Sequence, residues 1–274
     1  MMANKKNSPI FYYGLVNTSA AGYFVCKQFL NRENNVVYLT ANSSDSLEAS
    51  IQYFAPKNTA LLSFPEQKIG QMAVLHHLLT AQQPYVLIAQ YNDWQTPLPA
   101  PADFKANTFT IHRGDTLRRA DLLDILQHRG YSREDYTEVC GQYAVRGSVL
   151  DLFVSGEKFP FRLYFAGNRV ESICTFDIDS QTTQEHIDTV SILPLVFQHT
   201  PATLKDYVEN AQYVFDQPSA DFDFASYEKA VVFSTFPIAQ GTDCCLKANI
   251  EFKANFPLLD REVSTLTRQG LSVT

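Results

Sequence analysis

The sequence contains no uninterrupted apolar run of about 18 residues, the length at which a segment becomes a candidate membrane-spanning helix. Its N-terminal stretch, MMANKKNSPIF, carries two lysines but no long apolar region after them, so it does not have the pattern of a secretory signal peptide. These two absences predict a soluble, cytoplasmic protein.

Cysteine is scarce, and its spacing excludes the common cysteine-based sites. The number is odd, and no pair has C-x-x-C spacing, so reduced thiols are expected rather than a disulfide framework or a zinc site. The adjacent His76 and His77 diverge on a helix and are poorly placed to share a metal ion. We therefore expect no metal. The five cysteines are Cys26, Cys140, Cys174, Cys244 and Cys245.

Motifs of hydrolytic enzymes are also missing. Neither G-x-S-x-G nor H-E-x-x-H occurs, and the acidic stretches REDYTE (133–138) and DFD (221–223) are typical of solvated loops. We expect that this chain is not an enzyme. Its net charge of −7, from 22 basic and 29 acidic residues, argues against a nucleic-acid-binding surface over the whole chain, although a local basic patch stays open.

What is present is a globular composition with a clear alternation of element types. Of the 274 residues, 45% are hydrophobic and 13% aromatic, which is enough for one large or two ordinary domains with a packed core. Short apolar strands alternate with helices over the first hundred residues, a pattern that predicts a parallel sheet wrapped by helices. The prolines of TPLPAPADF (96–104) end this alternation. The expected strands are 10–16, 35–41, 59–64 and 85–91, and the expected helices are 19–32, 46–55 and 70–82.

The middle and final regions have different patterns. A helix over 114–131 is followed by strands over 142–154, 160–166 and 169–177, with connections short enough for antiparallel hairpins. This predicts an inserted α+β domain that closes at SILPL (191–195). Expected strands over 211–216, 229–236 and 247–254 and a helix over 258–270 suggest a return to the first domain. That domain would then be discontinuous.

The turn after the first strand occupies the position of a phosphate loop but lacks its chemistry. The motif G-x-x-x-x-G-K-[ST] uses glycines and a lysine to hold an anion. Counted from Gly14, the second glycine position is Ser19, the lysine position is Ala20 and the hydroxyl position is Ala21. We therefore interpret this segment as a helix-packing turn and expect no nucleotide or other cofactor.

An ordered set of motifs spans about residues 112–194: HRGDTLRRADLLDILQHRGY, GQYAVRGSVLDLF, PFRLYFAGNRVESICTFD and HIDTVSILP. It resembles the N-terminal region of the bacterial transcription–repair coupling factors (Mfd), in the stretch homologous to the UvrA-interacting domain of UvrB. The resemblance implies a degenerate RecA-like, P-loop-type α/β domain, discontinuous around a UvrB-type α+β antiparallel-sheet insert. The implied parts are 1–108, 109–194 and 195–274, the last being the return segment.

The resemblance also implies which residues contact a partner. The strand arginine before glycine and the arginine of P-x-R correspond to Arg146 and Arg162, and both are expected to bind UvrA. Gly147, Phe165 and Glu171 are expected on the same surface. From the residues alone, a strand arginine more often faces water or pairs with a neighbour such as Asp151 or Glu171.

The expected function is that of an adaptor region of a coupling factor, without nucleotide binding of its own, that recruits UvrA to stalled RNA polymerase in nucleotide excision repair. The family implies that a C-terminal region of the same protein also covers this surface, and that RNA polymerase and DNA bind through downstream domains. At Ala166, Cys174 and Thr182 the sequence departs from the residues that are usual in the family, so the expected basic patch is less extensive.

Two alternatives stay open. One is a fragment of a UvrB-like repair enzyme that binds DNA and ATP. The other is local DNA contact through arginines of the middle helix region, although the interleaved Asp115, Asp121 and Asp124 favour a solvated helix face. Those arginines are Arg113, Arg118, Arg119 and Arg129.

Overall fold

The computed structural model describes residues 9–14, 18–30, 34–42, 44–196, 202–224, 226–227, 229–238, 240–244, 261 and 264. The strand expected over 247–254 lies outside the described residues, as does most of the helix expected over 258–270. No helix in the described part of the chain is both long enough and apolar enough to cross a bilayer.

A parallel sheet of seven strands forms one part of the molecule, in the order β15-β1-β14-β13-β2-β4-β3. Strands β13 and β14 lie between β1 and β2 in space although they follow them by more than 150 residues in sequence. The expected discontinuity of this domain is therefore confirmed. The strands are β1 (Ile10–Tyr13), β2 (Asn35–Thr40), β3 (Ala60–Ser63), β4 (Tyr85–Gln90), β13 (Ala211–Asp216), β14 (Ala230–Ser234) and β15 (Thr242–Asp243).

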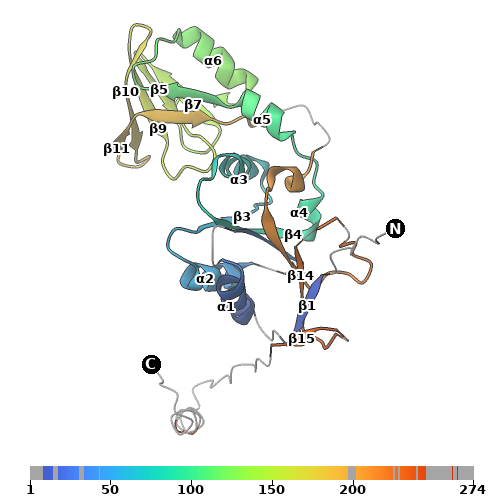
Figure 1. The fold of residues 1–274 in the computed structure, drawn as a ribbon. Helices are drawn as coiled ribbons and strands as arrows, with labels where there is room; N and C mark the ends of the chain where they lie inside the picture. Colours follow the sequence, from blue (N-terminus) through green and yellow to red (C-terminus); the bar gives the residue numbers. More distant parts are fainter. Residues whose placement is uncertain are drawn as a thin grey trace.

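Helices cover both faces of this sheet (Figure 1). On one face, α1 (Thr18–Gln28) and α2 (Asp45–Phe54) bury Val25 and Ile51 against alternate residues of β2, such as Tyr38. On the other face, α3 (Lys68–Thr80) packs Leu75 among the remaining β2 residues, such as Leu39. Burial on both faces explains why these strands are almost continuously apolar.

The proline-rich segment after β4 ends the alternation as expected, but it also contains helical residues. A short helix, α4 (Tyr91–Trp94), follows β4 directly, and α5 (Pro101–Asn107) begins at Pro101. Proline fits the first helical position because its missing N–H has no partner in the helix. The sequence pattern had suggested only a break at this point.

The inserted part contains a six-stranded sheet in the order β11-β10-β9-β8-β7-β6. All neighbouring strands are antiparallel except β6 and β7, which pair in parallel. Helix α6 (Arg119–His128) buries Leu122 and Leu126 in the core cluster that includes this sheet. The strands are β6 (Ser132–Arg133), β7 (Gln142–Arg146), β8 (Val149–Leu152), β9 (Phe161–Ala166), β10 (Arg169–Phe176) and β11 (Thr183–Ile187).

Three expectations for this region need correction. The single strand predicted over 142–154 is a hairpin, β7 and β8, because Gly147 adopts φ +57 and turns the chain. The helix begins at Arg119, five residues later than expected. Two strands that the sequence did not indicate, β5 (Phe109–His112) and β12 (Thr189–Ile192), pair with each other and bring the entry and exit of the insert together. The expected fold class is confirmed, while the boundaries at residues 108 and 194 stay predictions.

The two parts share one hydrophobic core cluster that runs from Leu39 and Leu75 to Leu163 and Ile173. The loop after β8 contacts α3 directly: the Ser155 hydroxyl donates a hydrogen bond to the carbonyl oxygen of Ile69. This direct contact means that the inserted sheet is held against the parallel-sheet domain.

Candidate partner-binding site on the antiparallel sheet

Strand alternation places the two arginines of interest on the outward face of the antiparallel sheet. Leu150, Leu152 and Leu163 point into the core, so Asp151 and Arg162, which alternate with them, point to the other face. Asp151 on β8 lies directly opposite Arg162 on β9. Arg146 ends β7, the strand on the other side of β8.

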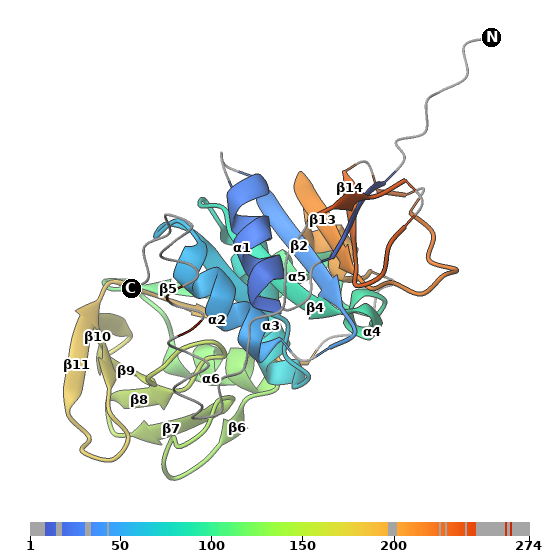
Figure 2. The same cartoon turned by 90° about the horizontal axis from the view of Figure 1, so that it is seen from below.

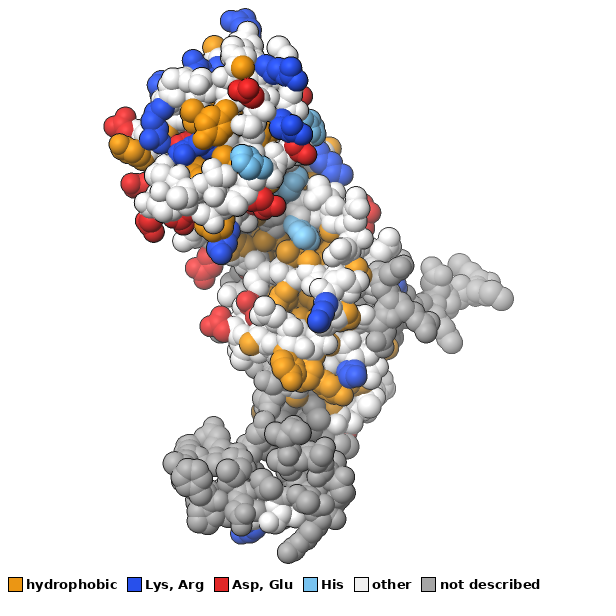
Figure 3. Space-filling model, turned by 90° about the vertical axis from the view of Figure 1, so that its left-hand side faces the viewer, with side chains coloured by type: hydrophobic (Ala, Val, Ile, Leu, Met, Phe, Trp, Pro, Cys, Tyr) orange, Lys and Arg blue, Asp and Glu red, His pale blue; other side chains and the backbone are white. Residues whose placement is uncertain are grey.

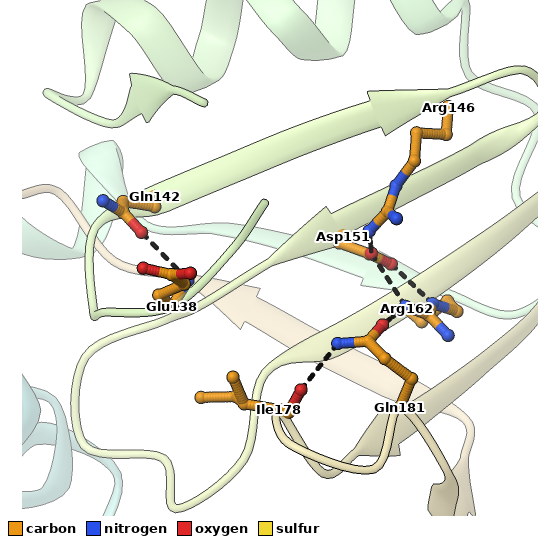
Figure 4. A network of polar contacts seen from close by, with 7 residues as sticks. All are labelled: Glu138, Gln142, Arg146, Asp151, Arg162, Ile178 and Gln181. Atoms are coloured by element: carbon orange, nitrogen blue, oxygen red, sulfur yellow. Dashed lines mark hydrogen bonds and ion pairs between the residues drawn. The ribbon is translucent and has the colours of Figure 1, made fainter. Parts of the chain in front are cut away.

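Both arginines bind the same carboxylate (Figure 4). Arg162 donates through Nε to Asp151 Oδ1 at 2.7 Å and through Nη2 to Asp151 Oδ2 at 2.9 Å. Arg146 donates through Nη2 to Asp151 Oδ2 at 2.8 Å. The side chain of Asp151 is 1% exposed, that of Arg162 is 14% exposed and that of Arg146 is 46% exposed. The pairing with Asp151 that was considered from sequence is therefore present.

Aromatic rings and an amide fix the two guanidinium groups further. Arg162 lies over the ring of Phe176 at 4.1 Å and donates through Nη2 to Gln181 Oε1 at 2.8 Å. Arg146 lies 5.0 Å from the ring centroid of the exposed Tyr136. Hydrogen bonding to Asp151 raises the pKa of Arg162, so its charge is retained over the whole physiological range. The guanidinium of Arg162 is thus held in place on several sides.

The charges of this cluster do not cancel. Two guanidinium groups share one carboxylate, which leaves one net positive charge on the cluster itself. Arg146 donates to Asp151 through one terminal nitrogen and its side chain is half-exposed, whereas Arg162 donates to Asp151 through both Nε and Nη2 and its side chain is largely buried. A partner carboxylate can therefore approach Arg146 more readily than Arg162.

Residues 109–196 match the family model described as the UvrB interaction domain. This segment is therefore similar to the UvrB interaction domain. The chain is 35% identical over 132 residues to the transcription-repair-coupling factor of Haemophilus influenzae and 33% identical over 132 residues to that of Escherichia coli. Each alignment covers 47% of this chain and 11% of the relative.

Two further relatives extend these comparisons. The transcription-repair-coupling factor of Staphylococcus haemolyticus is 24% identical over 80% of this chain, and the alignment covers 21% of that protein. The UvrABC system protein B of Thermotoga maritima is 30% identical over 40% of this chain. The similarity to the N-terminal region of coupling factors that the motifs indicated is confirmed. The matched region spans only about a tenth to a fifth of the coupling factors named here.

The remaining predicted contact residues lie in three different settings. Gly147 turns the β7–β8 hairpin, and a Cβ placed on it would meet no atom within 4 Å, although its carbonyl oxygen accepts a hydrogen bond from Arg119. Glu171 is exposed at a bulge in β10. Phe165 is 5% exposed and belongs to the core cluster, because it alternates with the outward Tyr164. Phe165 is therefore corrected from surface contact to core residue.

Several members of the site carried no clear signal in the sequence. Tyr136 lies in a loop before β7, and Phe176 and Gln181 flank the turn after β10. The sequence suggested Asp151 only as a possible pairing neighbour. Its central position depends on strand register, which fixes which residues of β7, β8 and β9 face each other.

The arginines considered for DNA contact each bind another group of the described part of the chain. Arg113 forms an ion pair with Asp188 at 2.6 Å, and Arg118 lies 3.9 Å from Asp121. Arg129 donates through Nε to the carbonyl oxygen of Asn107 at 2.6 Å, and Arg119 donates to the carbonyl oxygen of Gly147. Figure 3 shows both basic and acidic side chains on one face of the inserted part of the molecule. These contacts favour a solvated, mixed-charge surface.

The degenerate loop has an acidic neighbour. Gly14 adopts φ +77, and a Cβ placed on it would lie 2.8 Å from Asp243 Oδ1. Ala20 is half-buried and Ala21 is buried against α2 and the sheet, while the side chain of Ser19 lies outside the described residues. A carboxylate next to this turn opposes the approach of a phosphate group.

The structure also bears on the metal and thiol expectations. In the described ranges, no group of three or more His, Cys, Asp or Glu side chains could hold a metal ion. Burial raises the pKa of the Cys26 thiol to about 11, so this group is neutral and unreactive at physiological pH. Cys140 and Cys174 are free thiols, and Cys245 lies outside the described residues.

Proposed function

We propose that this chain is an adaptor region that couples transcription to nucleotide excision repair by binding UvrA. The family match of residues 109–196 and the similarity to transcription-repair-coupling factors support this assignment. The proposed UvrA-binding surface is the outward face of the antiparallel sheet around Arg146. Gly147 borders this surface, and Glu171 is a more peripheral member of it.

The observation that carries the proposal is the shared carboxylate. Asp151 positions both guanidinium groups on one face but neutralises only one of their two charges. Arg146 keeps an accessible fork that can pair with a carboxylate of UvrA, and such charge-assisted bonds contribute about 1.5–3 kcal/mol each. Arg162 is mainly a positioning residue in this proposal, because its fork is already occupied by Asp151 and Gln181.

The proposed adaptor does not use a nucleotide. Support comes from alanine at the lysine position of the loop and from the Asp243 carboxylate beside Gly14. The same two features count against the alternative of a UvrB-like enzyme fragment that binds ATP. In the proposed whole protein, contacts with RNA polymerase and DNA belong to other regions, and a C-terminal region covers the Arg146 surface when UvrA is absent.

A titration of the chain with UvrA tests this proposal. Arg146→Ala should weaken binding by roughly 2 kcal/mol, about 30-fold, because it removes the accessible fork from the interface. Arg113→Ala is the matched control, since it removes one exposed, ion-paired arginine from the small β5–β12 sheet. Binding of the two variants with equal affinity would contradict the proposed surface, and absence of binding by the unaltered chain would contradict the function.

A further inference from the structure

A cavity of about 450 Å³ lies outside the carboxyl ends of three neighbouring strands of the parallel sheet. Ala41, Tyr91 and Gln217 line it, and they are the first residues after β2, β4 and β13 respectively. Figure 2 shows α4, which begins at Tyr91, next to β4. The volume falls within the range of small-molecule sites, about 300–1,000 Å³.

The sheet topology makes this position a switch point. The chain leaving β2 continues through α2 to β3, on one side of the sheet, whereas the chain leaving β13 continues to β14, on the other side. Because β2 and β13 are adjacent, the two connections diverge and leave a crevice between them. In open α/β sheets, ligands bind in such crevices at the carboxyl ends of the strands.

Aromatic side chains form the walls of the cavity, and hydrogen bonds hold them. Trp94 Nε1 donates to the Tyr227 hydroxyl at 2.8 Å, and the Tyr91 hydroxyl donates to the carbonyl oxygen of Asp216 at 3.1 Å. The ring of Phe222 lies 5.6 Å from that of Tyr91 and 6.1 Å from that of Tyr227. The ring faces are therefore fixed before any ligand arrives, which lowers the entropy cost of stacking.

The lining carries no charged side chain within the described residues, but it is rich in amides. Asn92, Gln95 and Gln217 are exposed at the cavity and offer both N–H donors and carbonyl acceptors. The Asp216 carboxylate accepts a hydrogen bond from Thr40 at 3.2 Å, and Thr40 lies on the sheet face covered by α1 and α2, away from Trp94. The cavity thus suits a neutral group with an apolar face and a polar edge.

We propose that this cavity binds a neutral planar heterocycle, of the class that includes the nucleobases of free nucleosides. The aromatic walls stack on the ring, and the amides pair with donors and acceptors at its edge. The site is separate from the turn at Gly14, because β14 and β13 lie between β1 and β2. It is also independent of the proposed UvrA-binding surface.

Fluorescence titration of the full chain with adenosine, guanosine, cytidine and uridine tests the proposal. Trp94 is the only tryptophan in the sequence and lines the cavity, so its emission reports on this site alone. Saturable quenching by at least one nucleoside is expected. Phe222→Ala should weaken that binding about tenfold or more, consistent with the usual effect of removing a stacking ring. Gln95→Ala, at an exposed position, should weaken it severalfold without affecting folding.

Tyr53→Ala is the control, since Tyr53 is a highly exposed aromatic residue at the end of α2 and does not line the cavity. Unchanged affinity in this variant supports the assignment. Three outcomes would overturn it: no saturable quenching by any of the four nucleosides up to their solubility limits, equal binding by the parent chain and both cavity variants, or much tighter binding of adenosine triphosphate than of adenosine. The last result would mean that charge, rather than the ring, is recognised.

Discussion

Arg162 and Asp151 lie opposite each other on adjacent strands, and two parallel hydrogen bonds of 2.7 and 2.9 Å join their side chains. The carboxylate is 1% exposed, so the two guanidinium groups, rather than water, supply its hydrogen bonds. This pair therefore links the stability of the antiparallel sheet to the orientation of Arg146, which binds the same carboxylate.

Arg162→Ala should destabilise the fold by about 3 kcal/mol, because it leaves a buried carboxylate with only the single bond from Arg146. Urea unfolding monitored by circular dichroism measures this loss. Arg113→Ala, which breaks an exposed ion pair with Asp188, should cost less than about 1 kcal/mol. Similar losses in both variants would mean that the Asp151 pairing has no special structural role.

Gly156→Ala should destabilise the contact between the two parts of the molecule. A Cβ at this position would lie 2.3 Å from the Cβ of Ala73 on α3, and the residue also has φ +84. Gly167→Ala is the matched control, with φ +62 and no atom within 4 Å of the added Cβ. Thermal unfolding should show a loss of about 1–2 kcal/mol for the control and at least about 2 kcal/mol more for Gly156→Ala. Equal losses would contradict the close approach.

The stability of the fold should fall when the pH drops below neutral. Burial lowers the pKa of His76 and His77 below the usual value of 6.5, and the proximity of His77 lowers that of His76 further. The neutral imidazoles are favoured in the folded state, so their contribution is fully present above pH 6.5 and is lost as the pH falls through the lowered values. Urea unfolding at several pH values in this window measures how the free energy of unfolding changes with pH. That change should be smaller in the His76→Gln/His77→Gln double variant than in the parent chain. An unchanged pH dependence of the free energy of unfolding would mean that these histidines do not cause the loss of stability.

The chain should not bind ATP through the turn at Gly14. The loop has alanine at the lysine position. The carboxylate of Asp243 also lies beside the loop, because a Cβ placed on Gly14 would contact its Oδ1. Calorimetry with magnesium and ATP should show no affinity beyond that of adenosine, and no phosphate should be released. Micromolar ATP affinity, lost on Gly14→Val, would instead favour the UvrB-like alternative.

Local patterns in the sequence were sufficient for the alternating strands and helices of the first hundred residues, because strand and helix periodicities are properties of short segments. They did not indicate the hairpin at Gly147, since a continuous apolar run looks the same whether or not the chain reverses within it. Local patterns also did not show that Phe165 and Arg162 point to opposite faces of the sheet. Side chains alternate in direction along a strand, but only burial in the folded structure shows which of the two directions is the core.

The sequence by itself determined the element types, the missing phosphate-loop lysine and the motif that places Arg146 and Arg162 in one segment. Only the tertiary structure decided that both arginines share Asp151, because that contact depends on the register of three strands. The tertiary structure also decided that Tyr91, Trp94 and Phe222 line one cavity. Phe222 reaches this cavity only because β13, the strand before it, lies next to β2 in the sheet. Interactions between distant segments follow from how the whole chain packs, which no local pattern encodes.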